Sequence, residues 1–120
     1  MLALHAMPAG KRPPAPILNL SPLVGLFSGL THVVRFEPRD LTVRQLAVLC
    51  ALHESSEPLT VRGLAERFDL PKPSVTRSID RLQFEGLARR EIDPADRRSV
   101  LISLTARGLE FMARLEEALR

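Results

Sequence analysis

Hydrogen-bonding and cationic side chains are concentrated between residues 72 and 81. The candidates for chemistry are Lys72, Ser74, Thr76, Arg77 and Arg81. Arg77 can donate two hydrogen bonds to O6 and N7 of a guanine, and the Ser74 and Thr76 hydroxyls can bond a base edge or a phosphate. Lys72 suits a phosphate contact. The segment therefore favours recognition of nucleic acid, although Arg77 and Arg81 fit equally well as solvated charges on an amphipathic helix.

A second group of charges lies in the segment 93–99, where Asp96 precedes Arg97 and Arg98. A guanidinium at a hairpin tip can enter the minor groove of DNA, because a narrow groove concentrates negative potential. Asp96 would keep such an arginine extended by accepting its hydrogen bond. The alternative is a turn whose charges only neutralise one another.

The two groups form one patterned basic surface. Seven of the chain's 17 Lys and Arg fall between residues 72 and 98 together with five acids, so this stretch has a net charge of +2. The whole chain of 120 residues has a formal net charge of +3 and a pI of about 10.0. This balance favours an acidic partner over an acidic small substrate.

The segment 60–86 predicts two short helices around a tight turn. Thr60 is placed to cap the first helix, whose apolar residues have the spacing of one face: Val61, Leu64, Ala65 and Phe68. The segment 69–73 breaks this helix, and a second one begins at Pro73 or Ser74 and ends at Gly86. Its buried side is predicted to be Val75, Ile79 and Leu82. The pair makes a helix-turn-helix, whose second helix can enter the major groove.

From Leu87 the hydrophobic period changes to two. The alternation predicts strands over 88–92 and 100–104, joined by the charged turn. Phe84, opposite Val75 on the preceding helix, is expected to pack under this hairpin. The predicted fold class is therefore mainly α with a small β-hairpin, a winged helix-turn-helix.

Further helices are predicted on both sides of this unit. Leucines and valines over 18–34 predict a helix that is apolar on more than one side, with Ser21 as its N-cap. Thr42 is placed to cap a helix that runs to about His53, and Thr105 to cap the last helix. The inward stripe of the helix after Thr42 is expected to be Val43, Leu46, Ala47, Leu49 and Cys50.

The predicted elements divide the chain into an N-terminal arm and one domain. Residues 1–16, rich in Pro and Ala, predict a flexible arm. Residues 17–120 predict a single winged-helix domain. Its N- and C-terminal helices have more apolar surface than a domain of this size can bury, which predicts a homodimer with these helices as the interface.

Other chemistries lack their residues. The single cysteine precludes an intrachain disulfide and fits a cytoplasmic protein, and its place on the predicted stripe favours a core role over redox sensing. The three histidines have no second ligand at a metal-binding spacing. Phosphate loops, nucleophile elbows and membrane-spanning runs are not recognisable. We therefore expect no enzymatic activity, cofactor, metal or membrane insertion.

Residues 41–110 resemble the MarR-type winged-helix regulators. The resemblance rests on the segments 41–49 and 74–82, Gly86-Leu87, Arg90, Asp96-Arg97-Arg98, and 100–105 with Gly108, in the family's order and spacing. It implies a transcriptional regulator that binds a pseudo-palindromic operator in double-stranded DNA as a homodimer, often a repressor released by a small-molecule effector. It also implies Thr76 and Arg77 in the major groove, with Asp96 and Arg98 as the wing pair.

The alternative function is a protein-interaction module, a winged helix that binds another regulator. An adaptor of this kind has no need of Arg97 and Arg98 at the wing tip together with a polar recognition face, and it would show an exposed apolar patch in their place. The charged tip therefore favours a DNA-binding regulator.

Overall fold

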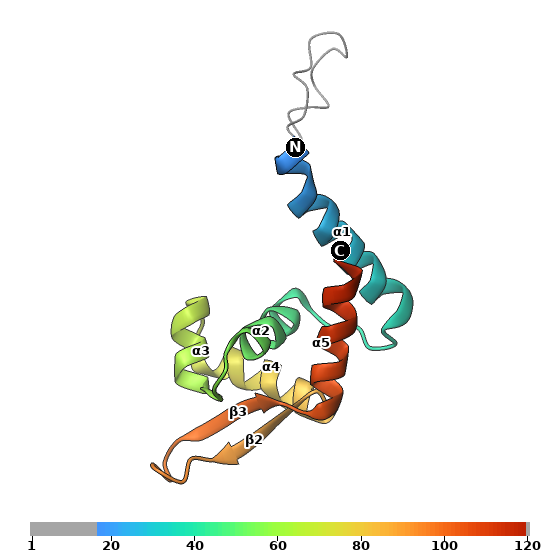
Figure 1. The fold of residues 1–120 in the computed structure, drawn as a ribbon. Coiled ribbons are helices and arrows are strands. Elements are labelled where there is room, and N and C mark those ends of the chain that lie inside the picture. The colour runs from blue at the N-terminus through green and yellow to red at the C-terminus, as the bar shows by residue number, and fades with distance from the viewer. Residues whose placement is uncertain (1–16, 120) are drawn as a thin grey trace.

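The computed structural model describes residues 17–119, so the arm predicted over residues 1–16 lies outside the described residues. Within them the chain forms five helices and three strands (Figure 1). Their order is α1 (Ile17–Phe36), α2 (Val43–Glu54), β1 (Leu59–Thr60), α3 (Val61–Phe68), α4 (Lys72–Phe84), β2 (Ala88–Ile92), β3 (Val100–Leu104) and α5 (Ala106–Ala118). The predicted fold class is confirmed, with α3 and α4 as the helix-turn-helix and β2 and β3 as the wing.

Threonine caps begin three of the helices at the predicted positions. Thr42, Thr60 and Thr105 each accept a hydrogen bond from the backbone N–H three residues on, at 2.9 or 3.0 Å. Thr42 completes a capping box, because the Gln45 side chain accepts the Thr42 N–H at 2.9 Å. Each cap contributes about 1 kcal/mol, so local sequence sets the starts of α2, α3 and α5.

The sheet has three antiparallel strands in the order β1-β3-β2, whereas the sequence predicted only the hairpin. In the hairpin, Ala88 is opposite Leu104 and Ile92 is opposite Val100. On its other edge β3 pairs with β1, where Leu59 is opposite Ile102. A strand of two residues is too short for a period of two to be recognised, which is why β1 was not expected.

The core lies between the helices α2 to α5 and the sheet. Its largest fully buried side chains are Leu49, Leu64, Ile79, Leu82, Leu87, Ile102, Val48 and Val75. The predicted buried stripe of α4 is therefore confirmed, and so is the inner side of α3 at Leu64 and Ala65.

The predicted inward face of α2 is wrong at two positions. Val43 is 81% exposed and Cys50 is also exposed, whereas the buried residues of the helix are Val48, Leu49, Ala51 and Leu52. Nearly every position from Leu46 to Leu52 is apolar, so periodicity alone does not single out a face. Packing against α4, α5 and β3 makes the choice, and the core role expected for Cys50 is wrong for the same reason.

Helix α1 packs beside α5 and extends past the end of the winged-helix unit (Figure 1). The backbone of α1 comes closest to the end of α5 at Gly29, where an added Cβ would lie 2.6 Å from Cδ2 of Leu119. The helix already begins at Ile17 and includes Pro22, so Ser21 is not its N-cap. Pro22 lies in the second turn of α1, where its ring fixes a φ that suits a helix but removes one N–H from the backbone hydrogen-bond ladder.

The start of the wing is joined tightly to the start of α5. Gly86 ends α4 with a φ of 76°, as its predicted role as a stop residue requires. The Thr105 hydroxyl donates to the Gly86 carbonyl at 2.6 Å, and the Thr105 N–H donates to the Leu87 carbonyl at 3.1 Å. A Cβ on Gly108 would lie 2.1 Å from the Leu87 oxygen, so only glycine allows this contact.

Replacing Gly108 should therefore damage the fold more than replacing an exposed helical glycine. We expect Gly108→Ala to lower the free energy of unfolding by about 3 kcal/mol, because the methyl group overlaps a backbone atom that cannot rotate away. Gly63→Ala is the control, since its Cβ would lie 3.2 Å from the Thr60 hydroxyl oxygen, and we expect a change of less than about 1 kcal/mol. Urea unfolding measures both, and equal effects would contradict the close contact.

Candidate nucleic-acid interface

The turn between α3 and α4 fixes how the second helix is presented. Asp69 ends α3 in the left-handed conformation, with φ 52° and ψ 50°, and the Leu70 N–H returns to the Ala65 carbonyl at 3.0 Å. Helix α4 begins at Lys72, slightly earlier than predicted, and Pro71 in the N-cap position supplies no side-chain cap. In this first turn Pro73 has no N–H and the Ser74 N–H donates to the Pro71 carbonyl at 3.0 Å, so the Lys72 N–H is the one left for an outside acceptor, at the positive end of the helix dipole.

The outer face of α4 is polar from Ser74 to Gln83, whereas the exposed residue at the end of the helix, Phe84, is apolar. Val75, Ser78, Ile79 and Leu82 face the core, whereas Arg77 is exposed and Ser74 and Thr76 are half-buried beside it. Among the described residues, Lys72 and Arg77 take part in no ion pair. The predicted contact residues of this helix therefore reach one exposed surface, and two of its cations keep all their donors for a ligand.

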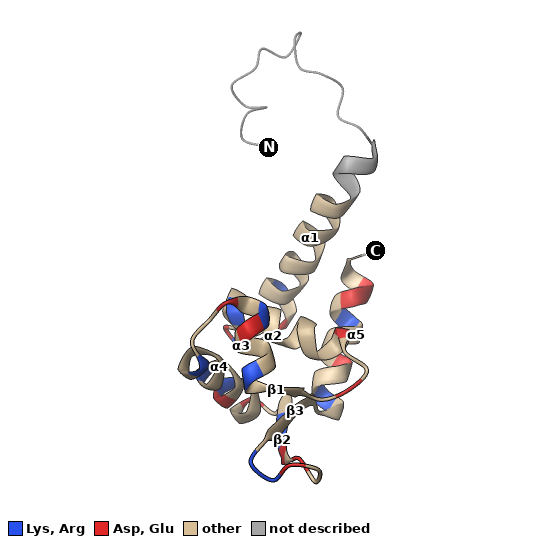
Figure 2. Ribbon diagram, turned by 90° about the vertical axis from the view of Figure 1, so that its left-hand side faces the viewer, with Lys and Arg blue, Asp and Glu red and all other residues tan. Residues whose placement is uncertain are grey.

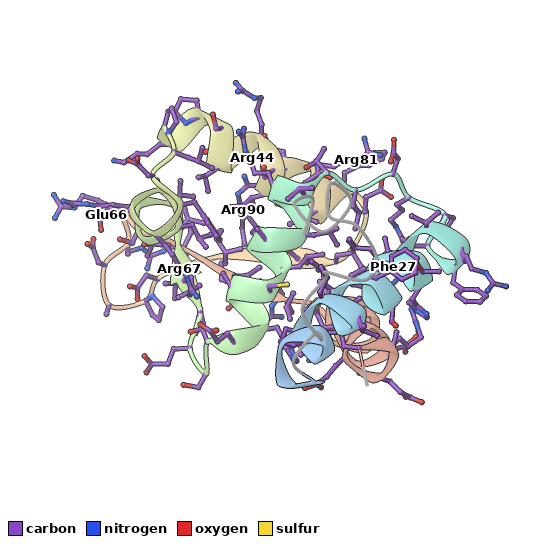
Figure 3. All side chains as sticks on the ribbon, turned by 90° about the horizontal axis from the view of Figure 1, so that it is seen from above. Phe27, Arg44, Glu66, Arg67, Arg81 and Arg90 are labelled. Atoms are coloured by element: carbon purple, nitrogen blue, oxygen red, sulfur yellow. The ribbon has the colours of Figure 1, made fainter. Side chains whose placement is uncertain are left out.

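Arg81 differs from Arg77 because it is already paired. Its Nε lies 2.8 Å from Oε2 of Glu85, one turn further along α4. Glu85 also accepts from Nε of Arg39 at 3.1 Å, and Arg39 pairs in turn with Glu37. Figure 3 shows Arg81 towards the far end of α4 when the molecule is seen from above. This chain of charges ties the end of α4 to the loop between α1 and α2, and Arg81 must share its guanidinium with Glu85.

Arg90 connects the wing to α4, a role that sequence reasoning did not assign. It lies on β2, and its guanidinium donates to the Gln83 side chain and, at 2.6 Å, to Oδ1 of Asp80. Both acceptors are on the outer side of α4. The sequence offers no signal for this contact, because the two segments meet only through the return of the chain at Gly86. The pairing limits how far the hairpin can move relative to the helix.

The wing tip has the predicted pairing of Asp96 with Arg98. Oδ1 of Asp96 accepts the Arg98 backbone N–H at 3.1 Å and lies 3.5 Å from its Nε. The turn is closed by the Asp93 N–H, which donates to the Ser99 carbonyl at 3.0 Å. The Arg98 side chain is 94% exposed, and Arg97 is exposed next to it. Figure 2 shows basic segments both on α4 and at this tip.

Two expectations about individual residues need correction. Phe84 is 82% exposed and does not pack under the wing, whereas Arg90 joins β2 to α4 through Asp80 and Gln83. Cys50 lies at the surface, and partial desolvation of its thiol, followed by the charge of Glu54, raises its pKa. A thiol with a raised pKa stays protonated at neutral pH and is a poor nucleophile.

The described residues show few features of a metal, membrane or small-molecule site. In the described part of the chain no group of three or more His, Cys, Asp and Glu side chains could hold a metal ion. None of the helices over residues 17–119 is long and apolar enough to cross a membrane. A hollow of about 310 Å³ lies between α1 and α5, lined by His32, Phe36, Glu37, Phe111 and Arg114.

Known proteins are similar to this chain in both sequence and fold. A family model described as the MarR family matches residues 39–99. The chain is 43% identical over 77 residues to the HTH-type transcriptional regulator YhbI of Bacillus subtilis, an alignment that covers 63% of this chain and 49% of YhbI. The chain thus spans about half the length of this curated relative.

Solved structures of regulators have a similar architecture. The transcriptional regulator Tm0710 from Thermotoga maritima matches with a TM-score of 0.75 and 25% identity, over 86% of this chain and 70% of that one. MepR of S. aureus, solved in complex with DNA, matches with a TM-score of 0.68 and 20% identity, over 85% of this chain and 81% of that one. The 20% identity of MepR supports the shared fold alone.

Loss of the Arg90 contact should loosen the wing. We expect Arg90→Ala to lower the free energy of unfolding by about 1 kcal/mol and to speed amide hydrogen exchange in β2 and β3, because two charge-assisted hydrogen bonds to α4 are lost. The control is Arg97→Ala at the exposed wing tip, since Arg97 takes part in no ion pair or side-chain hydrogen bond among the described residues, and this variant should leave exchange nearly unchanged. Identical exchange in the two variants would show that the Arg90 contact does not restrain the hairpin.

Proposed function

Because the chain belongs to the MarR family of transcriptional regulators, we propose that it binds a pseudo-palindromic operator in double-stranded DNA as a homodimer and represses transcription. The observation that carries the proposal is the polar outer face of α4, on which Arg77 is exposed in the second turn of the helix and takes part in no ion pair among the described residues. DNA recognition by a winged helix needs this face free for a major groove. The proposal places the protein in the cytoplasm, together with its DNA.

Each candidate residue has a role in this proposal. Arg77 reads a guanine edge, while Ser74 and Thr76 bond a base edge or a phosphate near the start of α4. Lys72 binds a backbone phosphate, and Arg81 binds another when it exchanges Glu85 for DNA. On the wing, Arg98 enters the minor groove with Asp96 as its orienting acceptor, and Arg97 adds positive charge beside it.

The dimer proposal rests on the apolar surface of α1. Much of this helix is apolar and exposed in the single chain: Leu23, Val24, Leu26, Phe27, Leu30, Val34 and Phe36. Phe27, labelled on α1 in Figure 3, is 69% exposed. Soluble monomers rarely expose so continuous an apolar patch. A second copy of the same chain is the simplest partner that can cover it, because most soluble oligomers are symmetric homo-oligomers. On this proposal residues 17–120 are one winged-helix domain that dimerises through its terminal helices.

A small-molecule effector has a candidate position in the hollow between α1 and α5. The apolar rings of Phe36 and Phe111 and the charges of Glu37 and Arg114 line it together. Few polar groups among apolar walls suit a small amphipathic ligand. Since α1 also belongs to the proposed dimer interface, a ligand there would alter the spacing of the two α4 helices.

The experiment that tests this function is selection of binding sites from random duplex DNA at physiological salt. A homodimer with two α4 helices should select a short inverted repeat, and so the selected sequence reports on both recognition and symmetry. Selection of a single half-site would contradict the dimer, and selection of no common sequence would contradict the function.

Arg77 should specify one base pair in each half-site. We expect Arg77→Ala to weaken binding to the selected operator by about 1 to 3 kcal/mol and to relax the preference at one position per half-site, because a bidentate contact to guanine is lost. Repeating the selection with the variant measures the second effect. Equal losses on operator and random DNA would mean that Arg77 contacts only phosphate.

The wing pair gives an expectation opposite to that of simple charge counting. Arg98→Ala should weaken operator binding and lower the salt slope of log K by about one unit for each subunit, or about two for the proposed dimer, because each half-site loses one cation that displaces counterions. Asp96→Ala should also weaken binding, although it removes a negative charge, since Arg98 loses the carboxylate that orients it. Tighter binding by Asp96→Ala with unchanged thermal stability would contradict the orienting role.

A further inference from the structure

A surface hollow lies where the helix-turn-helix meets the wing. Its volume is about 290 Å³. Three segments line it, namely the beginning of α3, the beginning of α4 and the exit of the wing turn into β3. The lining residues are Thr60, Val61, Arg62, Lys72, Arg98, Ser99 and Val100.

The charged side chains of the hollow are all cations. Arg62, Lys72 and Arg98 come from three different segments, and no carboxylate is among the described residues that line it. Arg62 is 3.6 Å from Glu66, but both side chains are more than two-thirds exposed, and a pair in that setting holds the guanidinium only weakly. Arg98 is likewise 3.5 Å from Asp96, which does not line the hollow, and the Arg98 side chain is 94% exposed. A hollow lined by three cations and no carboxylate favours an anion.

The backbone adds to this preference. Helix α4, which is 13 residues long, begins at Lys72 with its positive end at the hollow and without a side-chain cap. Ser99 at the wing exit also lines the hollow, and a serine hydroxyl can act as a donor. The anion therefore meets cations, a helix end and a hydroxyl from separate segments.

The position of the hollow identifies the anion, and this step rests on the function proposed above. When α4 lies in a major groove and the wing in the adjacent minor groove, the sugar-phosphate backbone that separates the two grooves must pass between them. The hollow lies between the start of α4 and the wing exit. We propose that it holds a backbone phosphate of DNA and that Arg62, on α3, is a phosphate-binding residue.

This contact fixes the register of the protein and gives no sequence information. Phosphate contacts position a protein on the duplex, whereas base edges specify the sequence. Arg62 should therefore contribute to affinity on every DNA sequence. That behaviour separates it from Arg77, whose loss changes the preferred bases.

The first test measures operator affinity against salt concentration for three variants. Arg62→Ala should lower the salt slope of log K by about 1.8, that is by about 0.9 for each subunit of the proposed dimer, which makes the affinity lost between about 50 and 200 mM salt roughly twelvefold smaller than for wild type. Arg62→Lys should keep the slope, because the charge remains. The matched control is Arg67→Ala on the same helix, since Arg67 pairs with Glu54 of α2 instead of lining the hollow. Equal slopes for Arg62→Ala and Arg67→Ala would overturn the proposal.

The second test locates the phosphate. Operators in which one phosphate at a time is replaced by an uncharged methylphosphonate should reveal one position per half-site that weakens wild type yet weakens Arg62→Ala much less. If the two proteins respond alike at every position, Arg62 does not bind a phosphate, although the proposed function still stands. If the protein selects no operator at all, the proposed function and this inference fail together.

A third arm distinguishes DNA from a free anion. Titration of the protein with inorganic pyrophosphate, followed by NMR, should show only weak binding around the hollow at physiological salt, because a single small anion lacks the other contacts of the duplex. Saturable micromolar binding that Arg62→Ala abolishes would assign the hollow to a free phosphorylated ligand and would overturn the proposal of a DNA phosphate.

Discussion

The carbonyl groups of Gly86 and Leu87 join the parts of the molecule on which the proposed interface depends. Helix α4 ends there, the wing begins there, and Thr105 bonds both carbonyls as α5 starts. Gly108 lets α5 approach so closely that no side chain fits between. Because three elements share one short segment of backbone, α4 and the wing base cannot turn independently. Arg90 extends this restraint by pairing β2 with α4.

A rigid junction explains how a weakly charged chain can present a DNA-binding surface. The formal net charge is only +3, so attraction cannot come from the chain as a whole. Instead the geometry brings Lys72 and Arg77 on α4 and Arg98 on the wing to the surface, while carboxylates such as Asp80 and Glu85 are occupied by arginines. Internal pairing thus removes much of the negative charge that would repel DNA.

The fold could be predicted wherever a local signal was strong. Threonine caps predicted the starts of α2, α3 and α5, a change of hydrophobic period predicted the hairpin, and Gly86 predicted the end of α4. The face of α2 could not be predicted, because nearly every residue in its middle is apolar and only packing selects among them. Contacts between distant segments, such as Arg90 with Asp80 or the meeting of Arg62 with the wing exit, have no sequence period and became visible only in the folded chain.

The shared junction at Gly86 and Leu87 implies that α4 and the wing act as one rigid unit on two adjacent grooves of DNA. Chemical footprinting of the selected operator tests it most directly, with dimethyl sulfate to probe guanine N7 in the major groove and hydroxyl radicals to probe the sugars along the minor groove. With a rigid unit, each half-site should show a protected guanine and, next to it, a protected minor-groove segment, and both should appear at the same protein concentration. Protection of the major groove alone, or of the two grooves at different concentrations, would contradict a rigid unit.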